Sequence, residues 1–168
     1  MDKTPADRWL EEAIRAHGDS LLRLCFLYLR DRQLAEDAVQ EAFLKAYRAL
    51  PTFRGDSSAK TWLTRIAVNV CKSALHRERP LPLSDAPEGS YEAQFRDDTV
   101  LQAVCALPQK LREVVLLYYF QELSTPEIAR MLHLPRNVIT ARLSRARAQL
   151  KTDLKGWYFD EQAETASQ

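Results

Sequence analysis

The sequence predicts an all-α protein made of two small helical domains that a flexible acidic linker joins. Three observations lead to this fold class. Apolar residues recur every three to four positions in several segments, and no stretch alternates apolar and polar residues as a strand would. Hydrophobic residues make up 46% of the 168 positions, which is enough for helical cores. Prolines and acidic residues between residues 80 and 98 separate two helical halves.

The first domain is expected at residues 1–79 and is expected to contain four helices. These helices are predicted at residues 9–16, 21–29, 34–50 and about 60–76. Asp19 and Ser20 are candidate caps for the second helix, and Pro51 ends the third. The third helix has the clearest pattern, because its apolar residues form a single stripe. A loop with a glycine hinge at Gly55 leads into the fourth.

The linker is expected at residues 80–98, where five acidic residues and one arginine give a net charge of −4. The second domain is expected at residues 99–157, and residues 158–168 are interpreted as a frayed tail. Pro108 suits the start of a helix, and the run from Val114 to Phe120 is apolar on every side. That run is therefore predicted to be buried in a small core.

Residues 124–154 have the pattern of a helix-turn-helix. Two helices are predicted at 125–132 and 135–154, with only two residues between them. Ser124 and Glu127 fit a capping box at the start of the first helix, and the small Ala129 allows the two helices to approach closely. This spacing favours binding of duplex DNA through the second helix.

The second helix has one-sided charge, with six basic residues and one acidic residue between Arg136 and Lys155. A solvated basic face without DNA is the alternative interpretation, but the turn spacing, the caps and the charge agree on DNA binding. Base-facing candidates are Arg136, Asn137, Thr140, Ala141, Ser144 and Arg145. Phosphate-binding candidates are Arg142, Arg147 and Lys151.

A second basic segment between Lys60 and Arg79 carries a net charge of +4 and has a different character. It contains Trp62 and Asn69 among its cations, and aromatic and amide groups suit the unstacked bases of a single strand. Phe53, at the entrance to the preceding loop, is a candidate stacking residue. For Trp62 alone, a place in the core is the favoured interpretation. The basic candidates in this segment are Lys60, Arg65, Lys72 and Arg77.

Other classes of function receive little support from the sequence. The three cysteines, Cys25, Cys71 and Cys105, lie far apart in apolar patterns and are interpreted as buried, reduced thiols. No metal site and no cofactor are expected, and no phosphate-binding or hydrolase motif occurs. An enzyme built on His17, His76 and His133 is a remote alternative. The N-terminus lacks an apolar signal, so we expect a cytoplasmic protein without membrane insertion.

Two groups of motifs together resemble a known family, the extracytoplasmic-function (ECF) sigma factors of the sigma-70 family. Residues 37–50, 53–57 and 61–69 resemble the second conserved region of that family. Residues 107–115, 123–129 and 142–147 resemble its fourth region. The order of the motifs and the linker length also fit, and the resemblance covers residues 19–154.

The resemblance implies a non-catalytic factor that binds core RNA polymerase, recognises promoters and helps to open them. The polar face of the 34–50 helix would dock on the polymerase clamp helices through Asp37, Gln40, Glu41, Phe43 and Leu44. Phe53, Arg54 and the following helix would read the melted minus-ten element, with Asn69 contacting a base. The helix-turn-helix would read the duplex minus-thirty-five element. An anti-sigma factor is an expected partner, and the acidic linker would follow the RNA path of the polymerase.

The predicted recognition helix departs from the family pattern. Residues 137–141 read Asn-Val-Ile-Thr-Ala where a Gly-Thr-Val-Lys/Arg-Ser pattern is common, so a base at Thr140 and a hydroxyl at Ala141 are missing. Minus-thirty-five preference is therefore not predictable from the resemblance. A stand-alone helix-turn-helix regulator, which would bind its operator without polymerase, is the alternative function.

Overall fold

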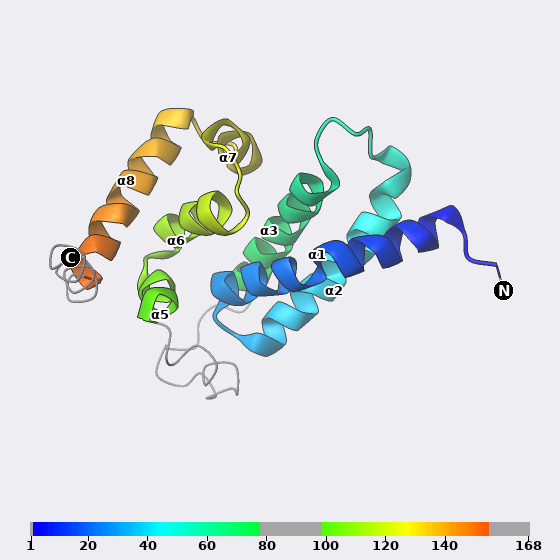
Figure 1. Ribbon diagram of the computed structural model, residues 1–168, viewed down its shortest axis with the longest axis horizontal. Coiled ribbons are helices and arrows are strands. Elements are labelled where there is room, and N and C mark those ends of the chain that lie inside the picture. Colours follow the sequence, from blue (N-terminus) through cyan, green and yellow to red (C-terminus); the bar gives the residue numbers. More distant parts are fainter. Residues whose placement is uncertain (1, 78–98, 155–168) are drawn as a thin grey trace, which may run out of the picture. The chain divides into compact units, whose positions relative to one another are not determined.

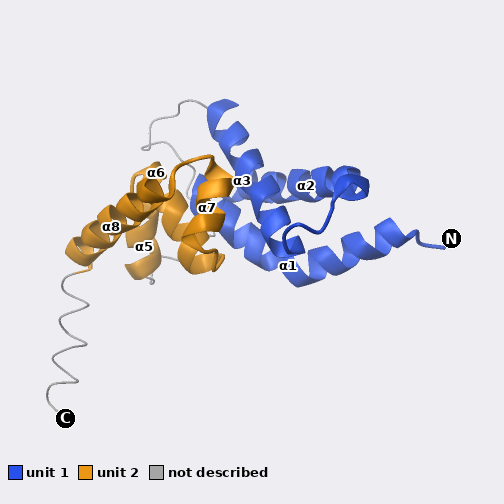
Figure 2. Ribbon diagram, turned by 90° about the horizontal axis from the view of Figure 1, so that it is seen from above, with its two compact units in different colours: residues 1–88 blue, residues 89–168 orange. Residues whose placement is uncertain are grey.

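The computed structural model describes residues 2–77 and 99–154, and its regular elements are helices (Figure 1). The chain divides into two compact units, Met1–Glu88 and Gly89–Gln168 (Figure 2). Among the described residues there is no strand, so the all-α prediction is confirmed. The predicted linker, 80–98, and the predicted tail, 158–168, lie outside the described residues.

The described part of the first unit has three long helices, α1 (Pro5–Leu29), α2 (Arg32–Ala49) and α3 (Ala59–Arg77), which pack on one another (Figure 1). α2 ends at Ala49, one residue before the predicted end, and a short 3-10 turn that contains Pro51, η1 (Leu50–Thr52), follows it. The sequence predicted four helices in this unit. Its first two predicted helices are in fact one, α1, which spans 25 residues.

The continuity of α1 has a simple physical reason. Gly18 costs about 1 kcal/mol in a helix interior relative to alanine, which a packed helix can tolerate. The buried residues Ala13, Leu21 and Leu24 keep one helical phase across the glycine, so the same face meets the core on both sides of it. Asp19 and Ser20 therefore lie inside a helix, and their predicted capping role is wrong.

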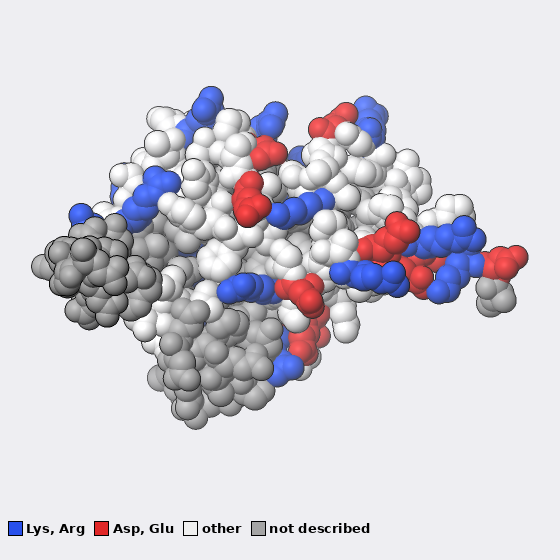
Figure 3. All heavy atoms as spheres, in the orientation of Figure 1, with Lys and Arg blue, Asp and Glu red and all other residues white. Residues whose placement is uncertain are grey.

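The start of α1 is fixed by a capping box instead. Thr4 Oγ1 accepts a hydrogen bond from the Asp7 N–H at 3.1 Å, and the Asp7 carboxylate accepts one from the Thr4 N–H at 2.9 Å. The backbone bond from Thr4 is the largest cause that lowers the pKa of Asp7. Asp7 also accepts a bond from the Tyr47 hydroxyl at 3.0 Å, which ties α1 to α2. Figure 3 shows acidic and basic side chains intermixed at this end of the chain.

Two cysteines meet in the core between α1 and α3. Cys25 and Cys71 are 0% and 1% exposed, and the hydrogen bond between their side chains, followed by burial, raises the pKa of the Cys71 thiol. The burial predicted for these two thiols is confirmed. Cys105 is half-buried, so its predicted burial is wrong.

The second unit contains α5 (Thr99–Ala106), α6 (Gln109–Val115), the π-helical turn η2 (Leu116–Phe120), α7 (Thr125–Leu132) and α8 (Arg136–Asp153). The buried Arg112 donates to the carbonyl oxygens of Cys105 and Leu107 at 3.2 and 3.0 Å, which ties the end of α5 to α6. The apolar run 114–120 is buried up to Leu117. Tyr119 is 50% exposed, so the predicted burial of the whole run is wrong.

Candidate nucleic-acid surfaces

The loop between η1 and α3 has a conformation that depends on glycine. Gly55 has a φ of 72°, in the left-handed region that side chains with a Cβ rarely adopt. Ser58 then begins α3, because its Oγ accepts the Thr61 N–H at 3.1 Å. Phe53 is half-buried at the entrance to the loop, and Arg54 is exposed beside it.

Three aromatic rings gather next to this loop. Phe53 stacks on Trp62, with ring centroids 4.5 Å apart and an angle of 25° between the planes. Trp9 of α1 meets Trp62 edge-on at 5.9 Å and 65°. Trp62 is half-buried, so it packs against its neighbours without being sealed in the core. Sequence reasoning missed Trp9, since nothing local links positions 9 and 62.

An exposed polar stripe continues from Trp62 along α3. Trp62, Arg65, Asn69 and Lys72 are spaced three, four and three residues apart, so they share one side of the helix. Arg65, Asn69 and Lys72 are exposed, as is His76 one further turn along. We call Trp62, Arg65, Asn69 and Lys72 together the α3 stripe. Asn69 thus lies on the surface among cations, although an amide is a poor choice for a helix interior.

Two of the predicted cations lie away from the α3 stripe. Lys60 is half-buried, and its helical position is far around α3 from Asn69. Arg77 is exposed, and its Nη2 lies 3.8 Å from the Glu41 carboxylate of α2. Of the candidates predicted on this helix, those of the α3 stripe lie together, and Lys60 and Arg77 lie apart from them.

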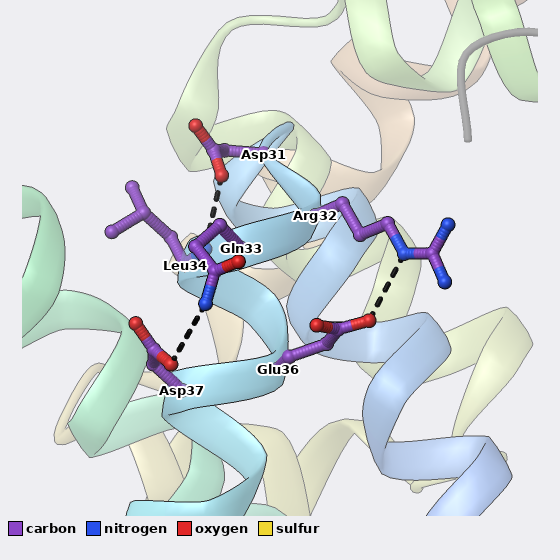
Figure 4. Close-up of polar contacts among 6 residues, drawn as sticks. All are labelled: Asp31, Arg32, Gln33, Leu34, Glu36 and Asp37. Carbon is purple, nitrogen blue, oxygen red and sulfur yellow. Dashed lines mark hydrogen bonds and ion pairs between the residues drawn. The ribbon is translucent and has the colours of Figure 1, made fainter. Parts of the chain in front are cut away.

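The polar face of α2 is ordered by contacts within the helix (Figure 4). Asp31 caps it by accepting the Leu34 N–H at 2.9 Å, and Gln33 Nε2 donates to Asp37 at 3.2 Å. Asp37 and Gln40 are exposed, and Leu44 is 53% exposed. Further along, Glu41 is half-buried and pairs with Lys45 at 3.2 Å. Ion pairs of this exposure contribute little to stability.

Phe43 is buried and does not belong to this polar face. It was predicted to contact polymerase, but it is only 6% exposed and lies in the core of the first unit, so that prediction is wrong. Its neighbour Ala42 is fully buried, so both lie on the inward stripe of α2. Of the predicted set, Asp37, Gln40, Glu41 and Leu44 remain on the surface.

The helix-turn-helix in the second unit has the predicted caps. The Ser124 Oγ accepts the Glu127 N–H at 3.3 Å, and the Glu127 carboxylate accepts the Ser124 N–H at 2.8 Å. The turn contains His133 with a φ of 56°, and the Leu134 N–H then bonds to the Ala129 carbonyl at 3.0 Å. The predicted bounds of α7 are confirmed, and α8 begins one residue after the predicted start.

Most of the predicted recognition residues lie on the surface of α8, whose visible face carries basic side chains (Figure 3). The inward positions are Ile139, Leu143 and Ala146, each at most 2% exposed. Thr140 is exposed, but its hydroxyl donates to the Arg136 carbonyl at 3.0 Å. The exposed candidates are Arg136, Asn137, Thr140, Ser144, Arg145 and Arg147, and the half-buried ones are Ala141 and Arg142.

Arg147 differs from the other candidates because it is held by aromatic side chains of η2. Its Nε donates to the Tyr119 hydroxyl at 2.7 Å, and its guanidinium lies over the rings of Tyr118 and Tyr119. Sequence reasoning missed both tyrosines as possible site residues, because it placed the apolar run in the core.

Neither a membrane span nor a metal cluster occurs in the described parts of the chain. None of the helices there is long and apolar enough to cross a bilayer. Residues 2–77 and 99–154 also hold no group of three or more potential metal ligands among His, Cys, Asp and Glu.

Two family models match the chain in succession. Residues 13–80 match "Sigma-70 region 2", which covers most of the three-helix unit. Residues 97–150 match "Sigma-70, region 4", which covers the helix-turn-helix unit.

Individual relatives agree with these matches. The RNA polymerase sigma-H factor of Pseudomonas aeruginosa is 38% identical over 155 residues, which is 80% of each chain. The ECF RNA polymerase sigma factor SigM of Mycobacterium tuberculosis is 35% identical over 86% of this chain and 76% of its own. A solved structure of CnrH in complex with the cytosolic domain of CnrY has a TM-score of 0.69 and 28% identity, and the match covers 89% of both chains.

Proposed function

The chain belongs to the ECF sigma factors of the sigma-70 family, and from this membership we propose how its two units divide the work of promoter recognition. As an RNA polymerase sigma factor it binds core polymerase and directs transcription initiation. The stand-alone regulator considered from the sequence is not favoured by these relatives. We propose further that the chain has no catalytic activity of its own and that binding energy alone drives opening of the DNA.

The second unit is proposed to read duplex DNA at the minus-thirty-five element. In a helix-turn-helix, the N-terminal half of the second helix enters the major groove. The exposed Arg136, Asn137, Thr140 and Ser144 occupy that half of α8, and the exposed Arg145 follows it directly. Arg145 can pair with a guanine edge through two hydrogen bonds, a contact that discriminates by about 1–3 kcal/mol against the wrong base.

The first unit is proposed to hold the melted minus-ten strand on the α3 stripe. The observation that carries this proposal is the exposure of Asn69 between Arg65 and Lys72, next to the stacked rings of Phe53 and Trp62. The amide offers donors and acceptors to a Watson-Crick edge, the cations attract the backbone, and the rings offer a stacking surface. Unstacking a base costs a few kcal/mol, which these contacts can offset.

The α2 face is proposed to dock on the clamp helices of the polymerase through Asp37, Gln40, Glu41 and Leu44. The half-exposed Leu44 supports this role, because a large apolar side chain amid polar groups suits the centre of an interface. This role would account for the Leu44 exposure, which the packing of the unit itself does not require.

We also propose that the chain works in the cytoplasm beside polymerase and that a cognate anti-sigma factor controls it. A solved structure in which CnrH is bound to the cytosolic domain of CnrY supports control by a protein partner, since this chain has the same fold. Masking either DNA surface, or the α2 face, would be sufficient for inhibition.

Run-off transcription with core polymerase on a library of genomic fragments tests the proposed function. We expect specific transcripts that depend on the chain and that disappear with Asn69→Ala or Arg145→Ala. Lys110→Ala is the matched control, since Lys110 is an exposed cation that belongs to neither the α3 stripe nor α8. A chain that binds a specific duplex tightly alone, and gains nothing from core polymerase, would contradict the proposal.

A further inference from the structure

The aromatic end of α6 has an unusual backbone. The Gln121 N–H bonds to the Leu116 carbonyl at 3.1 Å, five residues back, where an α-helix would bond four residues back. Such π-helical turns are rare and often mark functional sites. Here the turn leaves Leu116 and Leu117 fully buried while Tyr119 becomes half exposed.

The exposed Tyr119 is used to hold an arginine from α8. Its hydroxyl accepts a 2.7 Å bond from Arg147 Nε, and the guanidinium carbon lies 5.6 and 5.7 Å from the ring centroids of Tyr118 and Tyr119. The two rings are themselves packed edge to face at 4.9 Å. The bond from Tyr119 is also the largest cause that raises the pKa of Arg147.

The position of Arg147 suits a contact to the DNA backbone. It lies four residues beyond the buried Leu143 and eight beyond the buried Ile139, so it lies on a flank of α8 beside the buried stripe. A helix in the major groove meets phosphates along its flanks, whereas its central face meets the base edges. The bond to Tyr119 uses the Nε–H of Arg147, and the guanidinium has further N–H donors on its two terminal nitrogens.

We infer that Tyr119, with Tyr118 beneath the same guanidinium, is a positioning residue that fixes Arg147 to clamp a phosphate beside the recognition helix. This inference rests on the proposed duplex-binding role of α8 and adds a contact that is independent of base sequence. A free arginine loses rotamer entropy on binding, and the tyrosines remove that cost in advance. The atypical residues 137–141 make such sequence-independent affinity more valuable in this chain.

The test is a salt titration of the full chain with a fluorescent 25-base-pair duplex of mixed sequence, read by anisotropy. Arg147→Ala should lower the slope of log Kd against log salt by about one. Tyr119→Phe should keep the slope and raise Kd about threefold to tenfold, the effect of one hydrogen bond. The double variant should bind no worse than Arg147→Ala alone. Lys110→Ala, which removes an equal charge from α6, should change neither quantity.

Other outcomes separate this inference from the proposed function. If both substitutions lower the melting temperature while Kd and slope stay at wild-type values, the tyrosines serve only packing and the inference is wrong. A wild-type chain that does not bind the duplex at low salt also overturns it. The predicted slopes in a chain that fails to direct run-off transcription would support the inference and contradict the proposed function.

Discussion

The two units use aromatic side chains beside their basic helices in different ways. In the first unit, aromatic rings pack on one another, with Trp62 between Phe53 and Trp9, and the cations of α3 lie next to this cluster. In the second unit, two tyrosines pack directly on a cation, Arg147. We propose that the first arrangement offers flat faces to unpaired bases and that the second places a charge for a phosphate.

Net charge alone does not distinguish the two surfaces. Both helices are basic, yet the cations of α3 lie beside a cluster of aromatic rings, whereas those of α8 are interspersed with the exposed Asn137, Thr140 and Ser144. Single strands expose base edges and faces, whereas a duplex exposes mainly phosphates to a helix flank. We therefore propose that the groups beside each cation, rather than the net charge, determine whether a surface binds a single strand or a duplex.

The largest effect is expected from Trp62→Ala, which removes the centre of the aromatic cluster. Stacking on an aromatic residue is worth about 1–3 kcal/mol per base, so open complexes should become about 5- to 150-fold less populated. Permanganate footprinting of unpaired thymines would measure this, and duplex binding should not change. Trp62→Phe, which keeps a ring, is the control; equal losses in both variants would contradict a stacking role.

Asn69→Ala should have a smaller effect of the same kind. Loss of one hydrogen bond to a base predicts a roughly tenfold or smaller fall in open complexes. Because Asn69 is exposed, the melting temperature should stay at the wild-type value or rise slightly with the better helix former. An equal loss of duplex affinity would remove the distinction between the two surfaces.

The capping boxes predict a pH dependence in both units. The pKa of Glu127 is lowered chiefly by the Ser124 backbone N–H, so its folded pKa lies below the usual 4.5. The stability it contributes is therefore fully present above pH 4.5 and is lost as pH falls through the folded pKa. Ser124→Ala should cost about 1 kcal/mol in the second unit at pH 7. Thermal melts between pH 7 and 3 would measure both effects, and Glu127→Gln should flatten the acid limb.

The smallest effect is expected at the turn of the helix-turn-helix. His133 has a φ of 56°, a conformation that costs a residue with a Cβ about 1 kcal/mol and glycine very little. His133→Gly should therefore raise the stability of the second unit by up to about 1 kcal/mol, measured by urea unfolding. His133→Ala, which keeps the Cβ, should give no gain. Equal effects of the two substitutions would contradict the backbone explanation.

The sequence predicted best those features that local chemistry determines. Ser124, Pro126 and Glu127 define the start of α7 by themselves, and the exposure of Asn69 follows from the phase of α3. The cap proposed at Asp19 failed because burial on both sides of Gly18 outweighs one glycine. The pairs Trp9 with Trp62 and Tyr119 with Arg147 join positions 53 and 28 residues apart, so no local pattern indicates them.

The division of labour between the two units is tested most directly by measuring how two variants bind two probes. Complexes of core polymerase with the Asn69→Ala, Lys72→Ala variant or the Arg136→Ala, Arg145→Ala variant would be titrated with a single-stranded minus-ten oligonucleotide and with a minus-thirty-five duplex. Promoters recovered by run-off transcription would supply both sequences. We predict that the first variant loses affinity only for the single strand and the second only for the duplex. Equal losses of affinity for both probes in either variant would contradict two separate surfaces.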